Sequence, residues 1–269
     1  MRGDPVLGAH VVDWVHDLPF FWSVVVVFGA VYLIAAAISW VVLRLAVGDR
    51  ALAFKAVSPG LLPPLGVVFG LLVGFLAVQV WNDVGQAQTA VNREASALRS
   101  VVLLSASFPG VPQTRMRAHV RRDIKEAVNE EWPAMAGGHA SLTAVPAALA
   151  EALHLALGVT PHSEGQKVAQ REMVSALENA LDARRQRIIV SDSRVNWAKW
   201  MGVVLLAALT LLAIAFVHSE NRATTAIAMG IFASAVAVCL LMIASQDRPF
   251  AGRFGVKPNA LIQVMPDAR

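Results

Sequence analysis

Three short motifs carry charged side chains whose chemistry is ion pairing. They lie at residues 131–133, 182–187 and 247–250, and the third directly follows the last apolar stretch of the chain. An acid or a base of the third motif could pair with an opposite charge of the second and so fix the apolar stretches to the polar middle of the chain. We interpret the motifs as a structural latch; the alternative is that they line an ion vestibule. The predicted latch residues are Glu131, Trp132, Asp182, Arg184, Arg185, Arg187, Asp247, Arg248 and Phe250.

No pattern predicts catalysis or metal binding. The seven histidines never pair at metal-ligand spacing, and there is no glycine loop for phosphates and no nucleophile motif. Glu130 and Glu131 are adjacent, so on a helix their carboxylates point in different directions. Cys239 is the single cysteine and has no intrachain partner. We therefore predict that the chain is not an enzyme and that it holds no metal or cofactor.

The formal net charge of +4 does not predict a nucleic-acid partner. The basic residues are dispersed among acids and lack interleaved aromatic side chains. We expect no nucleic acid to bind.

Three glycines at a spacing of four residues mark the second apolar stretch. Gly66, Gly70 and Gly74 share one helix face, and small residues let helices approach closely in lipid. We predict that this face packs against a helix. One alternative is a neighbouring span of the same subunit, and the other is an adjacent subunit of a ring.

In the ring alternative, another face of the same stretch surrounds a shared axis. This face is apolar and then polar toward the middle region, and a narrow apolar constriction can gate ions by dewetting. None of the apolar stretches contains an ionisable side chain, which disfavours a proton-coupled carrier. The candidate pore-lining residues are Val68, Leu72, Phe75, Gln79, Asn82 and Asp83.

Four uncharged apolar stretches define the fold class. They cover residues 20–43, 61–80, 200–217 and 223–244, in a chain that is 56% hydrophobic and only 16% charged. About 20 helical residues cross the roughly 30 Å hydrocarbon core of a bilayer. We predict an all-α membrane protein with four transmembrane helices in two antiparallel hairpins and a helical soluble domain between the second and third spans.

The predicted organisation has five parts. They are an N-terminal tail (1–19), a first transmembrane hairpin (20–80), the helical domain (81–196), a second hairpin (197–244) and a C-terminal tail (245–269). A polar connector at 44–60 joins the first two spans. An even number of crossings places both termini and the domain on one side of the membrane. Lysines and arginines near the span ends are almost evenly divided between the hairpin side and the domain side. The sequence therefore leaves open which side of the membrane the domain faces.

The middle region reads as four helices separated by proline and glycine breaks. Apolar stripes recur at helical spacing, first from Val91 to Val102 and then from Met116 to Val128. A third helix is expected at about 141–157 and a fourth at about 164–190. We expect a small helical bundle; alternatively, these helices continue the second and third spans as rods.

Taken together, the motifs resemble the bacterial bestrophin-like proteins. The resemblance runs from about residue 61 to 257, through 92–95, 104–109, 131–133, 182–187 and 247–250 with Gly252. It implies a multi-pass membrane protein of the bacterial cell (inner) membrane. The more distant likeness to bestrophins implies a pentameric, anion-selective channel lined by the second span. The chain has no acidic calcium-binding run and no aromatic-rich neck, and Phe75 is the comparable residue near the middle of that span.

Two functional hypotheses follow. The first is a homo-oligomeric channel in the lipid bilayer that passes small ions along an axis lined by the second span. The second is a non-conducting membrane scaffold or sensor whose helical domain binds a partner or ligand.

Overall fold

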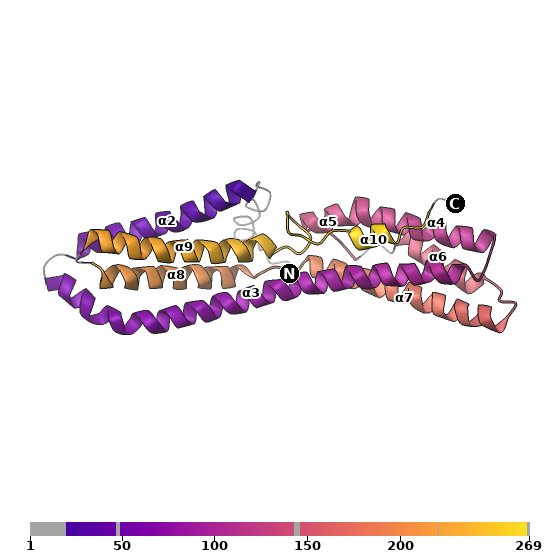
Figure 1. The fold of residues 1–269 in the computed structure, drawn as a ribbon, viewed down its shortest axis with the longest axis horizontal. Helices are drawn as coiled ribbons and strands as arrows, with labels where there is room; N and C mark the ends of the chain where they lie inside the picture. The colour runs from indigo at the N-terminus through magenta and orange to yellow at the C-terminus, as the bar shows by residue number, and fades with distance from the viewer. Residues whose placement is uncertain (1–19, 47–48, 143–145, 220, 268–269) are drawn as a thin grey trace, which may run out of the picture. The chain divides into compact units, whose positions relative to one another are not determined.

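The computed structural model describes residues 20–46, 49–142, 146–219 and 221–267, and these residues form helices and connecting segments without a strand (Figure 1). The helices are α2 (Phe20–Leu45), α3 (Asp49–Ser105), α4 (Val111–Glu126), the π-helix η1 (Ala127–Glu131), α5 (Trp132–Gly137), α6 (Ala147–Gly158), α7 (Glu164–Ser191), α8 (Trp197–Val217), α9 (Arg222–Gln246) and α10 (Asn259–Gln263). The predicted N-terminal tail at 1–19 lies outside the described residues.

The chain divides into two compact units. Unit 1 contains the described residues up to Trp81 together with Arg194–Asp247. Unit 2 contains Asn82–Ser193 together with the described residues from Arg248 onward. Helix α3 contributes residues to both.

Unit 1 contains the apolar helices. Helices α2, α3, α8 and α9 are each long and apolar enough to cross a membrane, which confirms the predicted fold class. Large apolar side chains such as Leu33 (72% exposed) and Ile231 (69% exposed) face outward, as lipid contact requires. The protein is therefore a multi-pass membrane protein.

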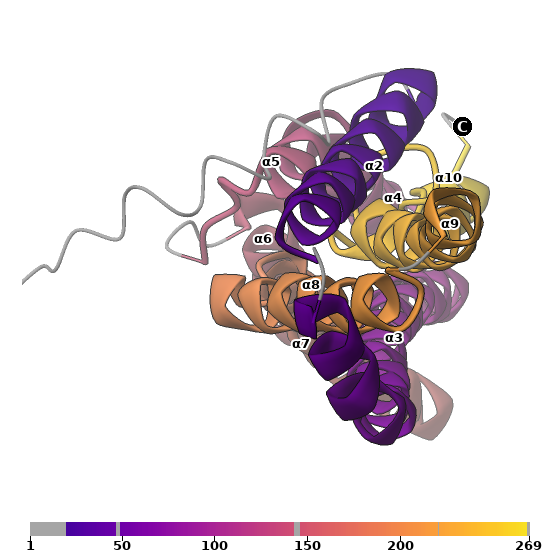
Figure 2. The same cartoon turned by 90° about the vertical axis from the view of Figure 1, so that its left-hand side faces the viewer.

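Packing within unit 1 centres on α9. Helix α2 lies along α9 and also contacts α8 (Figures 1 and 2). The Tyr32 hydroxyl and the Ser234 hydroxyl are 2.7 Å apart across α2 and α9, and the rings of Phe69 and Phe232 lie 5.6 Å apart across α3 and α9.

Asparagines cap both helices of the second hairpin. The side chain of Asn196 accepts a hydrogen bond from the Ala198 N–H, and that of Asn221 accepts one from the Ala223 N–H, which satisfies free amides at the starts of α8 and α9. The Asp247 carboxylate accepts a hydrogen bond from the Val195 N–H at 2.8 Å. The two ends of this hairpin are thus tied together within unit 1.

Most of the polar connector predicted at 44–60 is helical. Helix α2 extends to Leu45 and α3 already begins at Asp49. Helix α3 bends near its N-terminal end (Figure 1), and its first two turns beyond Val57 include Pro59, Pro63 and Pro64. Proline lacks the amide that a helix interior needs, and it therefore bends the helix rather than ending it here.

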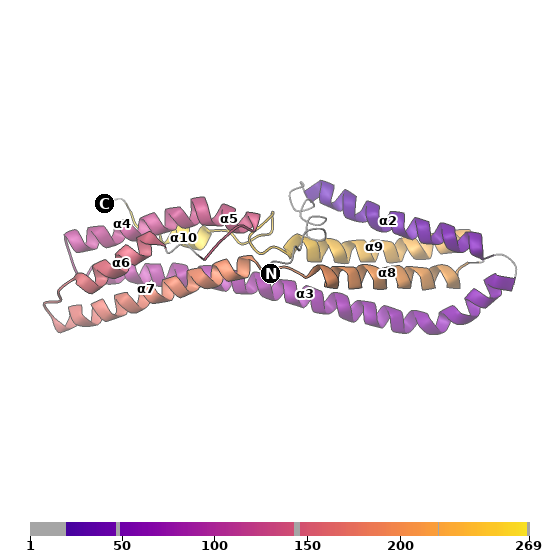
Figure 3. The same ribbon diagram turned by 180° about the vertical axis from the view of Figure 1, so that it is seen from behind.

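Unit 2 is a bundle of the C-terminal half of α3 with α4, α6 and α7 (Figure 3). Helix α6 packs on both α4 and α7. Its start at Ala147 is later than predicted, and residues 143–145 lie outside the described residues. The Ser163 hydroxyl caps α7 by accepting a hydrogen bond from the Gln166 N–H.

The alternative that helices of the middle region continue the second and third spans is correct for the second span and wrong for the third. Helix α3 runs without interruption from the second span to Ser105, whereas α7 ends at Ser191 and α8 begins at Trp197.

The residues after the last span do not form a separate tail. Phe250, Val256 and Leu261 are buried in the core of unit 2, because their apolar side chains cover the α4–α5 region.

Candidate functional site

A buried ion network lies at the centre of unit 2. Arg187 of α7 is fully buried, and its Nε and Nη2 donate to the two carboxylate oxygens of Glu94 on α3, at 2.6 and 3.0 Å. Nη2 also donates to Glu131 Oε2 of η1 at 2.7 Å. Bidentate pairing of this kind fixes orientation as well as charge. One arginine thus connects three helices.

Arg184 extends the network by one step. It lies three residues before Arg187 on the same face of α7, and its Nε donates to Glu131 Oε1 at 2.7 Å. Two carboxylates and two guanidinium groups therefore alternate in the order Glu94, Arg187, Glu131 and Arg184.

Burial and paired charges act in opposite directions on the groups of this network. Burial raises the pKa of the Glu94 carboxyl above its ordinary value, although the Arg187 guanidinium opposes this shift. Burial alone would raise the pKa of the Glu131 carboxyl, but the guanidinium groups of Arg187 and Arg184 hold that pKa below its ordinary value. Burial would likewise lower the pKa of Arg187, but the carboxylates of Glu94 and Glu131 raise it instead. The arrangement pairs two carboxyl groups with two guanidinium groups inside unit 2.

Trp132 joins the network to the chain that follows the last span. Its ring centroid lies 5.2 Å from the Arg187 guanidinium carbon and 5.4 Å from the Phe250 ring, at an interplanar angle of 84° in the latter pair. Its indole N–H donates to the Val256 carbonyl at 3.1 Å. The aromatic pair thus holds residues 250–256 against η1 and α7.

The π-helix explains how Trp132 reaches this position. The Trp132 N–H donates to the Ala127 carbonyl five residues back, instead of the usual four. Pro133 follows at once and has no amide to continue a regular ladder. Because the turn is one residue wider, Trp132 takes the buried position on the helix that residue 131 would otherwise occupy. Glu131 stays partly exposed. π-turns of this kind recur at functional positions.

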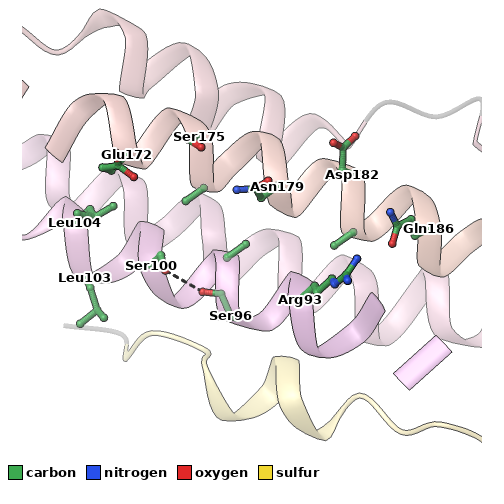
Figure 4. A pocket seen from close by; sticks show the side chains of 13 residues that line it. Arg93, Ser96, Ser100, Leu103, Leu104, Glu172, Ser175, Asn179, Asp182 and Gln186 are labelled. Atoms are coloured by element: carbon green, nitrogen blue, oxygen red, sulfur yellow. Dashed lines mark hydrogen bonds between the residues drawn. The ribbon is translucent and has the colours of Figure 1, made fainter. Parts of the chain in front are cut away.

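A polar groove lies between α3 and α7. It has a volume of about 760 Å³, with Ala97, Ala176 and Ala183 at its floor. Figure 4 shows Arg93, Ser96 and Ser100 on the α3 side, and Glu172, Ser175, Asn179 and Asp182 on the α7 side.

Four charged residues of the predicted latch lie outside the ion network. Asp182 is exposed at the groove, and Arg185 is exposed on α7. Asp247 binds the Val195 amide in unit 1, and Arg248 is half-buried. The structure therefore brings together Glu131, Arg184 and Arg187 by ion pairing and Trp132 with Phe250 by ring contact.

The glycine face of α3 is exposed, and no other described residue packs against it. A Cβ added to Gly66, Gly70 or Gly74 would meet no atom within 4 Å. The described residues of the same subunit thus provide no neighbouring span for this face. Packing against another subunit stays a prediction.

The candidate pore residues divide into two groups in unit 1. Val68 (52% exposed) and Phe75 (70% exposed) are open. Leu72 and Gln79 are half-buried toward α8: Leu72 lies beside Gly202, and Gln79 Oε1 accepts from Lys199 Nζ at 2.5 Å.

The two mouth candidates that follow belong to unit 2. Asn82 is exposed and Asp83 is half-buried.

Sequence reasoning missed two buried acids of unit 2. Glu94 and Asp123 are 0% and 4% exposed. Each lies three residues after a stripe residue, Val91 or Val120, and so shares its buried helix face. A carboxylate on an apolar stripe was the signal that could have identified both.

Comparison with known protein families agrees with this architecture. A family model described as the bestrophin-like domain matches residues 29–261. The chain belongs to the bestrophin-like family. No curated protein and no solved structure shows significant similarity to it.

The match covers the structural features described above. In this bestrophin-like chain, residues 29–261 include most of α2, all of α3 to α9, and the complete ion network with Trp132 and Phe250. Among the described residues, no group of three or more His, Cys, Asp or Glu side chains could hold a metal ion.

Proposed function

We propose that this bestrophin-like protein forms a homo-oligomeric channel in the bacterial inner membrane and passes small ions along an axis lined by α3. Anions and a pentameric ring are the ion and assembly that the likeness to bestrophins favours. The proposal involves no enzymatic step. Both termini and unit 2 lie on the same side of the membrane.

The main support for the proposal is the exposed glycine face of α3. Gly66, Gly70 and Gly74 lie in open space in the single chain, although such a row of small residues favours close helix contact in lipid. An adjacent subunit provides that contact. Val68 and Phe75, on the other flank of the helix, then face the axis.

The chemistry of this face fits passive conduction. Residues 61–80 of α3 contain no ionisable side chain, so the wall offers no proton relay. Phe75 supplies an apolar constriction that controls passage by its width and wetting. Selectivity then depends on pore width, backbone dipoles and the mouth residues.

Planar-bilayer recording of the purified oligomer tests the proposal. We expect discrete channel openings, and Phe75→Ala should raise the single-channel conductance because it widens the constriction. Leu33→Ala is the matched control, since Leu33 of α2 is equally exposed but lies on another helix. Silent bilayers from intact oligomers, or equal effects of the two substitutions, would contradict conduction through an α3-lined axis.

The groove of unit 2 favours a second candidate function. A non-conducting scaffold or sensor would use this polar groove between α3 and α7 to bind a ligand or partner. In that case Gly70→Leu disrupts assembly without changing ion flux across the membrane.

A further inference from the structure

Asp123 of α4 is a buried acid that the ion network does not pair. Its side chain is 4% exposed, and its Oδ2 is enclosed without a hydrogen-bond partner among the described residues. An ionised carboxylate is costly in such a place, whereas the neutral acid is far less so.

The charged groups around Asp123 are already paired without it. The carboxyl groups of Glu94 and Glu131 pair directly with the guanidinium groups of Arg187 and Arg184. An ionised Asp123 would add one unpaired negative charge to an enclosed cluster. Burial and the carboxylates of Glu94 and Glu131 together raise the pKa of Asp123 to about 8, against the opposing effect of the two arginines.

The charged groups that act on the Asp123 carboxyl are Glu94 of α3, Glu131 of η1, and Arg187 and Arg184 of α7. On α6 the ionisable residues are Glu151 and His154, and Glu151 contacts Arg122 at 2.6 Å and His119 at 3.3 Å. Helices α5 and α10 contain no ionisable side chain. Burial lowers the pKa of His119, so this residue is neutral at neutral pH.

We propose that Asp123 is a proton-binding site, protonated in the folded protein at neutral pH, and that loss of its proton in mild alkali loosens the packing of α4 in unit 2. The step breaks one carboxylic O–H bond, and the proton passes to water or hydroxide. The remaining carboxylate then repels Glu94 and Glu131 across the core.

The sign of the pH dependence follows from linkage. The ordinary pKa of 3.8 applies to the unfolded chain and about 8 to the folded chain, so the folded state holds the proton more tightly. The stabilisation is fully present below the unfolded value. It falls as pH rises and is lost as pH passes through the folded value.

Thermal unfolding of the full-length protein in detergent tests the site directly. We expect the wild-type Tm to fall by several degrees between about pH 6 and about pH 9.5, and Asp123→Asn to remove most of this decline. Asp182→Asn is the matched control, since Asp182 is an exposed aspartate of the same unit. It should keep the wild-type decline.

Infrared spectroscopy of the wild-type protein provides a readout that does not depend on any variant folding. A protonated-carboxyl band should be present near neutral pH and vanish in mild alkali, and Asp123→Asn should lack it. Absence of that band near neutral pH would overturn the proposal, as would a decline of Tm that Asp123→Asn shares in full with the wild type.

Discussion

At the scale of single residues, Arg187 is the most constrained position in unit 2. It is fully buried, and it is the link between Glu94 on α3 and Glu131 on η1. A buried ion pair contributes little net stability compared with a good apolar core, but removal of one partner leaves a buried charge uncompensated.

Replacing Arg187 should therefore destabilise the protein strongly. We expect Arg187→Met to lower the free energy of unfolding by about 3–5 kcal/mol, because Glu94 is left buried without its partner. Arg185→Met, on the exposed face of the same helix, should change it by less than about 0.5 kcal/mol. Denaturant titration in detergent measures both.

A double variant separates charge imbalance from lost packing. Glu94→Leu combined with Arg187→Met should recover part of the loss, because the buried carboxylate is removed as well. Simple additivity of the two single effects would contradict the pairing.

Glu131 should govern stability in acid. Its folded pKa is lower than its ordinary value of 4.5, so its stabilisation is present above that value and is lost as pH falls through the folded pKa. Glu131→Gln should lower Tm at neutral pH and flatten the acid limb of the Tm profile. Glu130→Gln, an exposed neighbour, should leave the acid limb unchanged.

Part of this network was predictable from residue types. The second motif was predicted to form ion pairs with the third, and the structure pairs Arg184 and Arg187 of the second motif with Glu131 of the first. Glu94 was not predicted, because a single acid in an apolar stripe shows no partner until tertiary packing brings a residue 93 positions away beside it.

At the scale of elements, the π-helix and the segment after the last span depend on one another. The wide turn at 127–131 places Trp132 where it holds the Val256 carbonyl and the Phe250 ring. A regular helix would place Glu131 on that face instead.

Trp132→Phe should loosen this attachment. The substitution removes the indole hydrogen bond to Val256 and weakens the contact with Arg187, at a cost of about 1–3 kcal/mol. Hydrogen exchange should then increase in residues 250–256. Trp197→Phe, at an exposed tryptophan of α8, is the control and should leave that segment protected.

The glycine face of α3 gives a prediction about assembly. Gly70→Leu should dissociate the oligomer, because the added side chain holds adjacent helices apart. Gly29→Leu is matched, since Gly29 of α2 also has no atom within 4 Å of an added Cβ and should tolerate the change. Cross-linking in membranes distinguishes the two, and equal behaviour of both variants would exclude this face as the interface.

The element boundaries show what sequence patterns can and cannot provide. The four spans were predictable because length and absence of charge are local properties. The polar connector at 44–60 gave no sign that α3 begins as early as Asp49, because its polar residues and Ser58-Pro59-Gly60 are not typical of a helix interior. The π-helix had no periodic signal of its own, since Val128 continued the apolar stripe at normal spacing.

At the scale of the whole molecule, four spans predict a definite topology. An even number of crossings returns the chain to its starting side, so we expect tags at both ends to report from the same compartment. Cysteine labelling at Ser58, with Cys239 replaced by Ser, should report from the opposite side. Tags that report from opposite compartments would require an odd number of spans.

The two units alternate along the sequence, so residues that contact each other in unit 2 are synthesised at different times. Glu94 leaves the ribosome 93 residues before Arg187, and Trp132 precedes Val256 by 124. The acid must therefore stay hydrated while its partner is still untranslated, and the tryptophan ring stays uncovered until α9 has been inserted. A nascent chain that ends before residue 248 therefore lacks Phe250, Val256 and Leu261, and the core of unit 2 is incomplete until they are added.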